Sequence, residues 1–209
     1  MGKLELQSCV IGSVATNCYF LKNKETGEML IIDPADQPDR IVQKVDEMAG
    51  TPVAILLTHG HFDHILAAKE FKEKYQIPIY ATVYERKHLG NPALNLSGFS
   101  GRAYSLEADE EVDDLDFLEL AGFEIQVLHT PGHTPGSCCY YLKAEDVLFS
   151  GDTVFCGSVG RTDFPGGSMQ EITDSLHRLL EVLPEDTKVY PGHDAPTTIG
   201  YEKRYNPFV

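Results

Sequence analysis

The apolar positions of this chain follow two different spacings. The run VAILLT at residues 53–58 is apolar throughout, which is typical of a short strand buried on both faces. The stretch PDRIVQKVDEMA instead places its apolar residues at helical spacing, namely Ile41, Val42, Val45 and Met48. Along the chain, these two patterns predict strands at residues 3–12, 16–23, 27–33, 53–58, 77–82, 116–120, 123–130, 137–143, 146–150 and 187–192. They predict helices at residues 38–49, 64–75, 83–89, 169–183 and 197–206.

The order of these elements indicates the architecture. Strands follow one another near the N-terminus and then alternate with helices in both halves, which favours two sheets covered by helices on the outside. No Pro- or Ser-rich linker and no repeat of solenoid period divides the sequence. We therefore expect one α/β domain over residues 1–209, a length that buries enough surface to fold without disulfides.

Charge and cysteine content narrow the classes of partner. The chain carries 17 Lys and Arg against 32 Asp and Glu, a formal net charge of −15, and its basic residues do not cluster. Such a surface repels a polyanion, so we expect no nucleic-acid partner. No apolar run reaches the roughly 20 residues of a membrane span, and the N-terminus MGKLELQSCV has no signal-like region, so no membrane association is expected. The five cysteines form no CxxC pair, and we interpret them as reduced core residues of a cytoplasmic protein.

Histidines gather directly after the strand predicted at residues 53–58. The segment THGHFDH supplies His59, His61, Asp63 and His64. His59 and His61 are two positions apart, so an extended backbone points them to the same side. Asp63 and His64 begin the next helix and face a second point. The alternative is a chance cluster of solvated residues. With 8 histidines in 209 residues, however, a random six-residue window is expected to hold about 0.2 histidines, whereas residues 59–64 hold three.

Other strand ends repeat this pattern. The segment VLHTPGHTPGS delivers His129 and His133, VLFSGDTVF delivers Asp152, and KVYPGHDAP delivers His193. A glycine directly precedes each of the last three residues and lets the backbone turn sharply there. Since α/β folds place their ligand sites where strands end, we expect these side chains to meet.

These side chains are of the kinds that bind first-row metals. Two such cations, each with three or four protein ligands, need about seven groups when one carboxylate bridges them. Imidazole and carboxylate suit zinc, iron or manganese, and a structural zinc site is not expected without a cysteine ligand. The pattern therefore predicts a site for two divalent metal ions, with zinc as the first expectation and iron or manganese as alternatives. The candidate ligands are His59, His61, Asp63, His64, His133, Asp152 and His193.

Four motifs, THGHFDH, HTPGHTPGS, GDTVF and PGHDAPTT, occur in this order. Together they resemble the metallo-β-lactamase superfamily, and most of all its glyoxalase II branch of hydroxyacylglutathione hydrolases. The likeness covers nearly the whole chain, including TNCYFL and LIIDPAD, and implies an αββα sandwich with a dinuclear site along one edge. By position, the resemblance assigns three ligands to a first metal, three to a second and one to a bridge: His59, His61 and His133; Asp63, His64 and His193; and Asp152.

The resemblance also implies a reaction. A water shared by two divalent ions is acidified toward neutral pH, and the resulting metal-bridging hydroxide attacks a carbonyl carbon. A thiolate leaves readily, so the expected substrate is a small thioester such as S-lactoylglutathione. Asp63 and Asp152 are the carboxylates that we expect to take part in catalysis.

The segment GSVGRTDFPGG is the expected substrate loop. Its Arg161 is a planar donor suited to a ligand carboxylate, and glyoxalase II enzymes carry a basic residue in the comparable loop. An ordinary surface ion pair is the alternative for Arg161. Typical glyoxalase II enzymes add a C-terminal helical domain that contacts glutathione, whereas this chain ends soon after His193. Lys203 and Arg204 are its candidates to replace those contacts. The chain therefore resembles the short, single-domain bacterial type.

Two other functions fit the same residues. Persulfide dioxygenases share this fold and a similar GRTDF loop, and they use one iron, whose ligands here would be His59, His133 and Asp152. A non-enzymatic metal-binding protein of the same fold is the second alternative, and we expect such a protein to have lost some ligands. Asp152 and Phe155 argue against the β-lactamase and homoserine-lactone hydrolase branches respectively.

Four residues near these motifs have less certain roles. Asp33 either orients a metal ligand as an outer acceptor or starts a turn before Pro34. His129 is either structural or a partner of a ligand. His88 and His177 lie in predicted helices and are expected at the surface.

Overall fold

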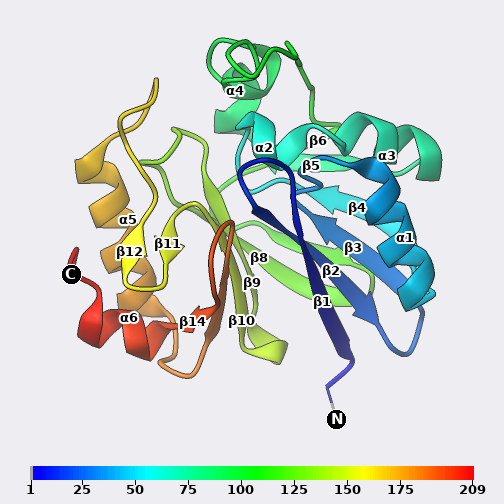
Figure 1. The fold of residues 1–209 in the computed structure, drawn as a ribbon. Coiled ribbons are helices and arrows are strands. Elements are labelled where there is room, and N and C mark those ends of the chain that lie inside the picture. The colour runs from blue at the N-terminus through cyan, green and yellow to red at the C-terminus, as the bar shows by residue number, and fades with distance from the viewer. Residues whose placement is uncertain (1) are drawn as a thin grey trace.

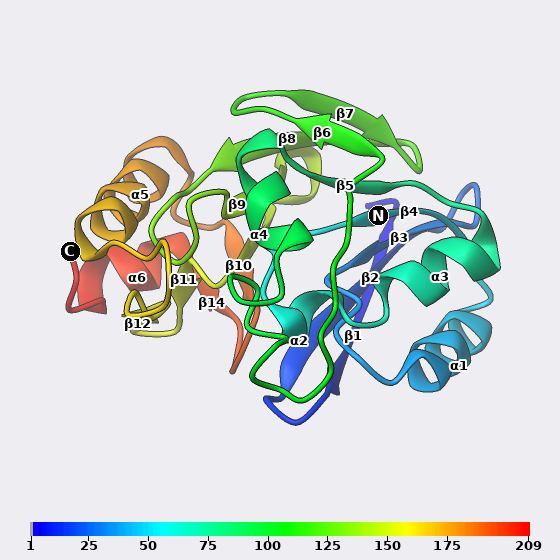
Figure 2. The ribbon, with the colours of Figure 1, turned by 90° about the horizontal axis from the view of Figure 1, so that it is seen from above.

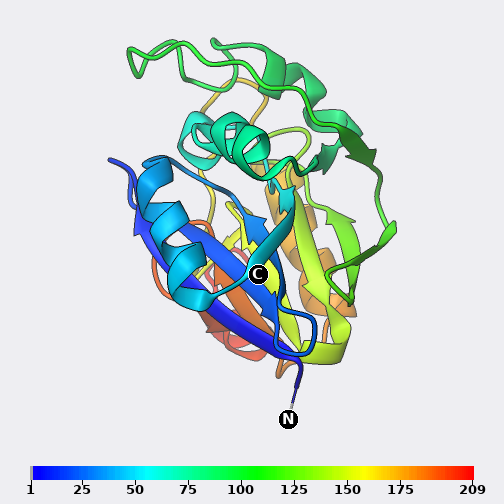
Figure 3. The same ribbon diagram turned by 90° about the vertical axis from the view of Figure 1, so that its right-hand side faces the viewer.

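The computed structural model describes residues 2–209 and shows two sheets packed face to face, with helices on both outer faces (Figures 1 and 3). The first sheet has six strands in the order β1-β2-β3-β4-β5-β6: Leu4–Ile11, Thr16–Asn23, Glu28–Ile32, Thr51–Leu56, Ile79–Thr82 and Glu110–Val112. The second has six in the order β14-β13-β10-β9-β8-β7: Thr197–Thr198, Lys188–Pro191, Val147–Gly151, Cys138–Leu142, Phe123–His129 and Phe117–Leu120. The expected αββα arrangement is confirmed.

Helices and one small hairpin complete the fold. The α-helices are α1 (Pro38–Met48), α2 (Phe62–Ile65), α3 (Ala68–Tyr75), α4 (Arg86–Gly90), α5 (Met169–Val182) and α6 (Ile199–Tyr205). Two 3-10 turns are η1 (Val83–Glu85) and η2 (Lys143–Glu145), and the hairpin pairs β11 (Val154–Phe155) with β12 (Ser158–Val159). Seen from above, α1 and α3 lie at one end of the molecule and α5 and α6 at the other (Figure 2).

Three apolar layers hold these elements together. Strand β2 is buried on both faces. Because successive side chains of a strand point to opposite sides, neighbouring residues of β2 belong to different apolar layers. Phe20 belongs to the layer under α1 and α3, which also contains Phe71, whereas Leu21 belongs to the layer between the sheets with Phe149. A third layer joins the second sheet to α5 through Leu176. The fully apolar run that the sequence predicts, in β4, is likewise covered on both faces, with Ile55 in the first layer and Leu56 in the layer between the sheets.

The strand directions bring several loops to one edge. Strands β3, β4 and β5 are parallel to one another, and β10 is parallel to β13. The carboxyl ends of parallel strands meet at the same edge of a sheet, so the loops after β4, β10 and β13 emerge where α/β proteins carry their ligand sites. The two sheets are also joined there, because the Cys138 amide donates to the carbonyl oxygen of Thr58 at 2.9 Å.

Several elements differ from the sequence-based expectation. The helix predicted at residues 64–75 is split into α2 and α3, because the Ala67 amide donates to the Pro34 carbonyl at 3.1 Å instead of continuing the helix. Strand β6 and the β11–β12 hairpin were not predicted. Strand β6 has three residues and each strand of the hairpin has two, which is too short to show an apolar alternation. Among residues 2–209, no helix combines the length and the apolar character needed to cross a membrane.

Candidate metal centre

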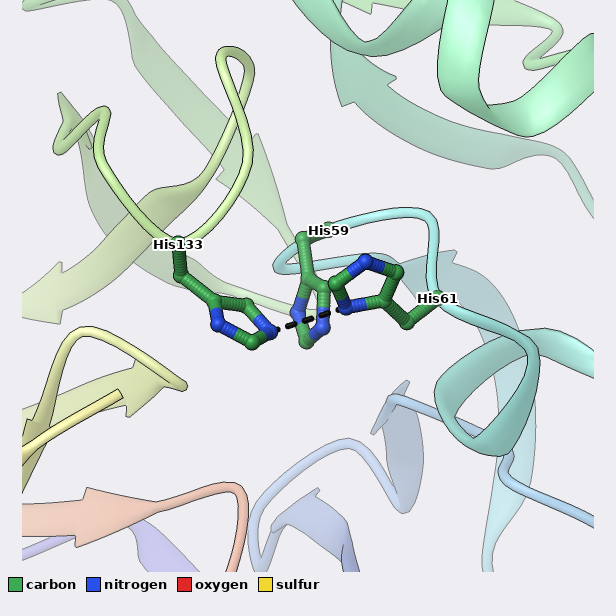
Figure 4. A group of neighbouring side chains, drawn as sticks. All are labelled: His59, His61 and His133. Atoms are coloured by element: carbon green, nitrogen blue, oxygen red, sulfur yellow. Dashed lines mark hydrogen bonds between the residues drawn. The ribbon is translucent and has the colours of Figure 1, made fainter. Parts of the chain in front are cut away.

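The loop after β4 presents two histidines at the sheet edge. His61 directly precedes α2 and has an extended backbone, and the buried rings of His59 and His61 have their centroids 4.9 Å apart. His133 reaches the same point from the loop after β8, with its Nε2 atom 2.8 Å from Nδ1 of His61 (Figure 4). Its ring centroid lies 4.7 Å from that of His59. One ligand atom from each of the three residues lies within 4.8 Å of the others, as a shared metal requires.

A second group lies beside the first. Asp63 and His64 come from α2, and His193 follows β13. Oδ2 of Asp63 is 3.3 Å from Nε2 of His193 and 3.5 Å from Nε2 of His64. The Thr16 hydroxyl donates to the same carboxylate oxygen at 3.0 Å and holds it in place. These three residues also have ligand atoms within 4.8 Å of one another.

Asp152 lies between the two groups. Its Oδ2 atom is 3.4 Å from Nε2 of His133 and 3.5 Å from Nε2 of His193, while Oδ1 is 3.4 Å from Nε2 of His64. One carboxylate therefore contacts a histidine of each group. The structure brings together all seven side chains that the sequence singled out, and the bridging role of Asp152 stays a prediction.

Asp33 fixes one end of this arrangement. Its Oδ1 atom accepts from the Thr58 amide at 2.8 Å, and its Oδ2 atom accepts from the Thr58 hydroxyl at 2.6 Å. Oδ2 also lies 2.9 Å from Nδ1 of His64. Of the two roles open for Asp33, the hydrogen bonds support that of an acceptor that orients a ligand.

Hydrogen bonds determine which ring nitrogens are free. His133 donates from Nδ1 to the main-chain carbonyl of Arg161 at 2.8 Å, so its Nε2 atom keeps a lone pair. The Thr58 hydroxyl gives its hydrogen to Asp33, so at 3.2 Å it accepts from Nδ1 of His59 and leaves Nε2 of that ring free. Each ring is thus oriented by one nitrogen and presents the other.

The free atoms test whether a metal fits. Among residues 2–209, five buried side-chain nitrogen or oxygen atoms have no hydrogen-bond partner, and four of them belong to this cluster: Nε2 of His59, His61 and His64, and Oδ1 of Asp152. An unpaired buried polar atom costs free energy, so such atoms are rare unless something binds them. Imidazole and carboxylate donors suit a divalent cation of the first transition row. The residues present therefore fit a metal centre.

The protonation of the cluster reflects its crowding. Burial lowers the pKa of His59 well below its usual range, and the neighbouring His64 adds to this effect. Burial alone lowers the pKa of His64 too, but the carboxylates around it outweigh that effect and raise the pKa to about 10. Burial alone raises the pKa of Asp63, yet His64 and His193 together bring it below its ordinary value. Without metal, a proton on His64 compensates the carboxylates that a cation would neutralise.

Two glycines allow the loops to approach this closely. A Cβ atom on Gly192 would lie 2.1 Å from Oδ1 of Asp152 and 2.7 Å from the His64 ring. A Cβ atom on Gly160 would lie 1.9 Å from the carbonyl oxygen of Asp152. Any larger residue at either position would displace a candidate ligand.

A comparison with protein families decides the class of this chain. A model described as the metallo-beta-lactamase superfamily matches residues 11–193, a range that contains all seven candidate ligands. The chain belongs to the metallo-β-lactamase superfamily. The histidine and aspartate groups of this member are consistent with a dinuclear metal site.

Relatives in this superfamily match nearly the full length. A protein of Bacillus subtilis (strain 168) named "Probable metallo-hydrolase YqgX" is 40% identical over 201 residues, covering 95% of this chain and 94% of the relative. A protein of Haemophilus influenzae named "Hydroxyacylglutathione hydrolase GloC" is 35% identical over 205 residues, covering 92% of each chain. These relatives support a metal-dependent hydrolase.

Two similar crystal structures carry further information. BLEG-1, named a B3 metallo-β-lactamase, is 41% identical with a TM-score of 0.92, and the match covers 98% of this chain and 99% of that one. TTHA1623 in a di-iron-bound form is 35% identical with a TM-score of 0.86, covering 97% and 100%. A protein named a β-lactamase thus stands among the similar structures, while the argument from Asp152 against that branch stays a prediction for this chain. Two irons occupy one of these relatives, so the fold accepts metals other than zinc.

A cavity of about 560 Å³ opens over the cluster of candidate ligands. Its walls are largely apolar apart from the cluster itself, and its lining includes Val14, Phe62, Leu96, Phe155, Val159, Arg161, Phe164 and Asp194. The Arg161 side chain lies at this cavity as expected, but it also makes two hydrogen bonds of 2.7 Å to Asp163. Its guanidinium carbon lies 4.0 Å from the centre of the Phe164 ring. The ion pair expected as the alternative for Arg161 is therefore present, and it holds the side chain at the cavity; a contact of Arg161 with a substrate stays a prediction.

The structure also places the other residues that the sequence singled out, and it corrects some of these expectations. His88 was expected at the surface but is only 4% exposed, because the loop at residues 160–167 covers it. His129 stacks on Tyr84 and lies 2.8 Å from the Pro135 carbonyl, which is a structural role. Lys203 and Arg204 face Glu185 and do not line the cavity. His177 is exposed, as expected.

The cysteine prediction holds only in part. Cys18, Cys138 and Cys139 are buried and free, as core residues should be. Cys9 is half-buried, and Cys156 is exposed because it lies at the turn of the β11–β12 hairpin.

Sequence reasoning missed Glu85, a buried residue that contacts the candidate site. Glu85 is 1% exposed and contacts both histidine-bearing loops of the first group. A lone glutamate in a charged segment has no pattern that marks it. The one available signal was its place in the first turn of a predicted helix, three residues after a strand that ends at the edge carrying the ligands.

Proposed function

We propose that this protein is a dinuclear metal-dependent thioesterase that hydrolyses a small thioester such as S-lactoylglutathione, with zinc as the expected metal. The observation that carries the proposal is the set of four unpaired buried atoms that could bind a metal: three histidine nitrogens and one oxygen of Asp152, the carboxylate that contacts both ligand groups beside an open cavity. Two divalent ions bound there supply an acidified water and a Lewis acid for a carbonyl oxygen. The similarity to GloC of Haemophilus influenzae supports a thioester of glutathione as the first substrate to test.

The residues of this chain prepare the site for that reaction. Thr16 holds the Asp63 carboxylate through a 3.0 Å hydrogen bond, and Asp33 holds His64, so the second ligand group is fixed before a substrate arrives. Phe155 and Phe164 form apolar parts of the cavity wall, which limit the access of bulk water and hold the substrate beside the metals. Arg161 offers the remaining donor atoms of its guanidinium to an anionic group on the substrate. The thiolate product is a good leaving group and needs no general acid.

Hydrolysis of β-lactams is a second candidate function. Its support is the 41% identity to BLEG-1, named a B3 metallo-β-lactamase, over almost the whole of both chains. Two metal ions held by the same residues would also support hydrolysis of a lactam carbonyl. The two candidate functions therefore differ in their substrate and not in the metal centre.

The test compares hydrolysis of a thioester and of a β-lactam on one preparation of the metal-loaded protein, and adds an oxygen-consumption assay on an iron-loaded preparation. We expect hydrolysis of S-lactoylglutathione or of another small thioester, followed by release of the free thiol, at a kcat/KM well above that for a chromogenic β-lactam. Asp152→Asn serves as the matched inactive variant, because it keeps the size of the side chain but removes the charge. Faster hydrolysis of the β-lactam would favour the second candidate. Oxygen consumption with glutathione persulfide on the iron-loaded protein, without thioester hydrolysis, would favour a persulfide dioxygenase.

A further inference from the structure

Glu85 is a buried carboxylate outside the set of candidate ligands. It ends the turn η1, directly after β5, and is 1% exposed. Its Oε1 atom accepts from the Gly60 amide at 2.8 Å, and its Oε2 atom accepts from the Thr134 hydroxyl at 2.9 Å. Burial of a carboxylate is costly unless hydrogen bonds compensate it, so its position calls for a reason.

The partners of Glu85 give that reason. Gly60 lies between His59 and His61, and Thr134 directly follows His133. One carboxylate therefore joins the two backbone segments that carry all three histidines of the first group. The distance of 2.8 Å between Nδ1 of His61 and Nε2 of His133 depends on the separation of these segments (Figure 4).

The surroundings leave little freedom at this contact. A Cβ atom on Gly60 would lie 3.0 Å from Oε1 of Glu85, and one on Gly136 would lie 2.3 Å from Oε2. Burial raises the pKa of this carboxyl, and His88 together with the hydrogen bonds from Gly60 and Thr134 lowers it only in part. Both oxygens thus face donors, and a main-chain N–H cannot become an acceptor. Glutamine at this position removes the negative charge. Its amide nitrogen would face either the Gly60 N–H, which cannot accept, or the Thr134 hydroxyl, which would have to turn from donor to acceptor.

The same short unit also contacts the substrate loop. His88 lies three residues further on, in α4. Its Nε2 atom lies 3.1 Å from the carbonyl oxygen of Pro165, in the loop at residues 160–167. That loop carries the Arg161 carbonyl that orients His133. Residues 83–90 therefore support His133 from two directions, through Thr134 and through the loop.

We propose that Glu85 is a positioning residue for the first group of metal ligands. By holding the segment at residues 59–61 against the segment at residues 133–136, it sets the spacing of the three imidazoles and hence the affinity of that group for a metal ion. The inference concerns the metal centre alone, and it stands for a thioester or a β-lactam substrate alike.

The test replaces Glu85 by glutamine and measures metal binding directly. We expect Glu85→Gln to bind one of its two Co²⁺ ions about 10- to 100-fold more weakly in competition with a chelator, while the other ion keeps its affinity. The visible absorption of the Co²⁺ bound to the first group should change as well, because it reports the ligand geometry. Glu202→Gln is the matched control: Glu202 is also fully buried and accepts from Thr197 and Asn206, but it contacts none of the candidate ligands.

A milder pair of variants covers the case in which Glu85→Gln does not fold. Thr134→Val removes one donor to Glu85 at nearly constant volume, and Thr134→Ser keeps it. We expect the valine variant to lose affinity at one Co²⁺ ion and the serine variant to bind like the original protein. Unchanged affinities and spectra in Glu85→Gln, or in Thr134→Val if only that variant folds, overturn the proposal. An equal loss in Glu202→Gln also overturns it, since any buried glutamate would then have the same effect.

Discussion

The Nδ1 atom of His133 donates to the main-chain carbonyl of Arg161 at 2.8 Å. The backbone of this arginine therefore orients a candidate ligand, whereas its side chain lies at the cavity beside Phe164. These two roles are separable, because a substitution at position 161 changes the side chain and keeps the carbonyl.

Arg161→Ala is predicted to weaken substrate binding and to leave the metals in place. Loss of a charged donor should raise KM for an anionic thioester about tenfold and change kcat by no more than about twofold. Steady-state kinetics and metal content of the same preparation measure both effects. Arg102→Ala, at an exposed arginine paired with Asp36, is the control. An unchanged KM would mean that Arg161 makes only an ordinary surface ion pair and does not bind the substrate.

His61→Ala and His193→Ala are predicted to remove one metal ion each, because each takes a nitrogen from a different ligand group. Both should lower kcat/KM for the thioester by at least about 100-fold, since the reaction needs both ions. His177→Ala, at an exposed position on α5, should keep two ions and full activity. Substantial thioesterase activity in either of the first two variants would rule out the dinuclear assignment.

Metal affinity is predicted to rise with pH. The carboxylates around His64 raise its pKa to about 10 without metal, so this ring is protonated at neutral pH. A metal binds only the deprotonated ring, so binding releases this proton, and the apparent affinity should increase about tenfold per pH unit between pH 7 and 9. Titration calorimetry in buffers of different ionisation enthalpy counts the released protons. A count of zero would contradict the predicted charge state.

Gly192→Ala is predicted to damage the centre. Its Cβ atom would lie 2.1 Å from Oδ1 of Asp152, and the carboxylate must move away from His64 to make room. We expect metal affinity to fall by about tenfold or more. Gly90→Ala is the control, because a Cβ atom there meets no other atom within 4 Å. Equal affinities in both variants would show that the close approach of Gly192 is not needed.

The sequence predicts the fold and the composition of the site well where local patterns are strong. Buried strands such as β4 have no polar interruption, and His59 and His61 follow that strand directly. A helix break at Ala67 is invisible to this reasoning, because its cause is a hydrogen bond to Pro34, thirty-three residues earlier in the chain. Local spacing predicts which residues end strands, but not which distant segments accept their hydrogen bonds.

The residues that support the ligands were harder to predict for the same reason. His88 has the neighbours of a surface residue in the sequence, and only the distant loop at residues 160–167 buries it. Glu85 stands among charged residues, yet its partners Gly60 and Thr134 come from two other loops. Ligands are recognised by residue type, whereas their supports are recognised only by contacts.

The number of metal ions per chain tests the central claim most directly. We would measure it by plasma mass spectrometry on protein purified without chelator and without a metal-binding tag. The seven clustered side chains predict two equivalents of zinc, iron or manganese in total. One equivalent of iron, with no second ion taken up on titration, would contradict the dinuclear hydrolase and point instead to oxidation of a persulfide.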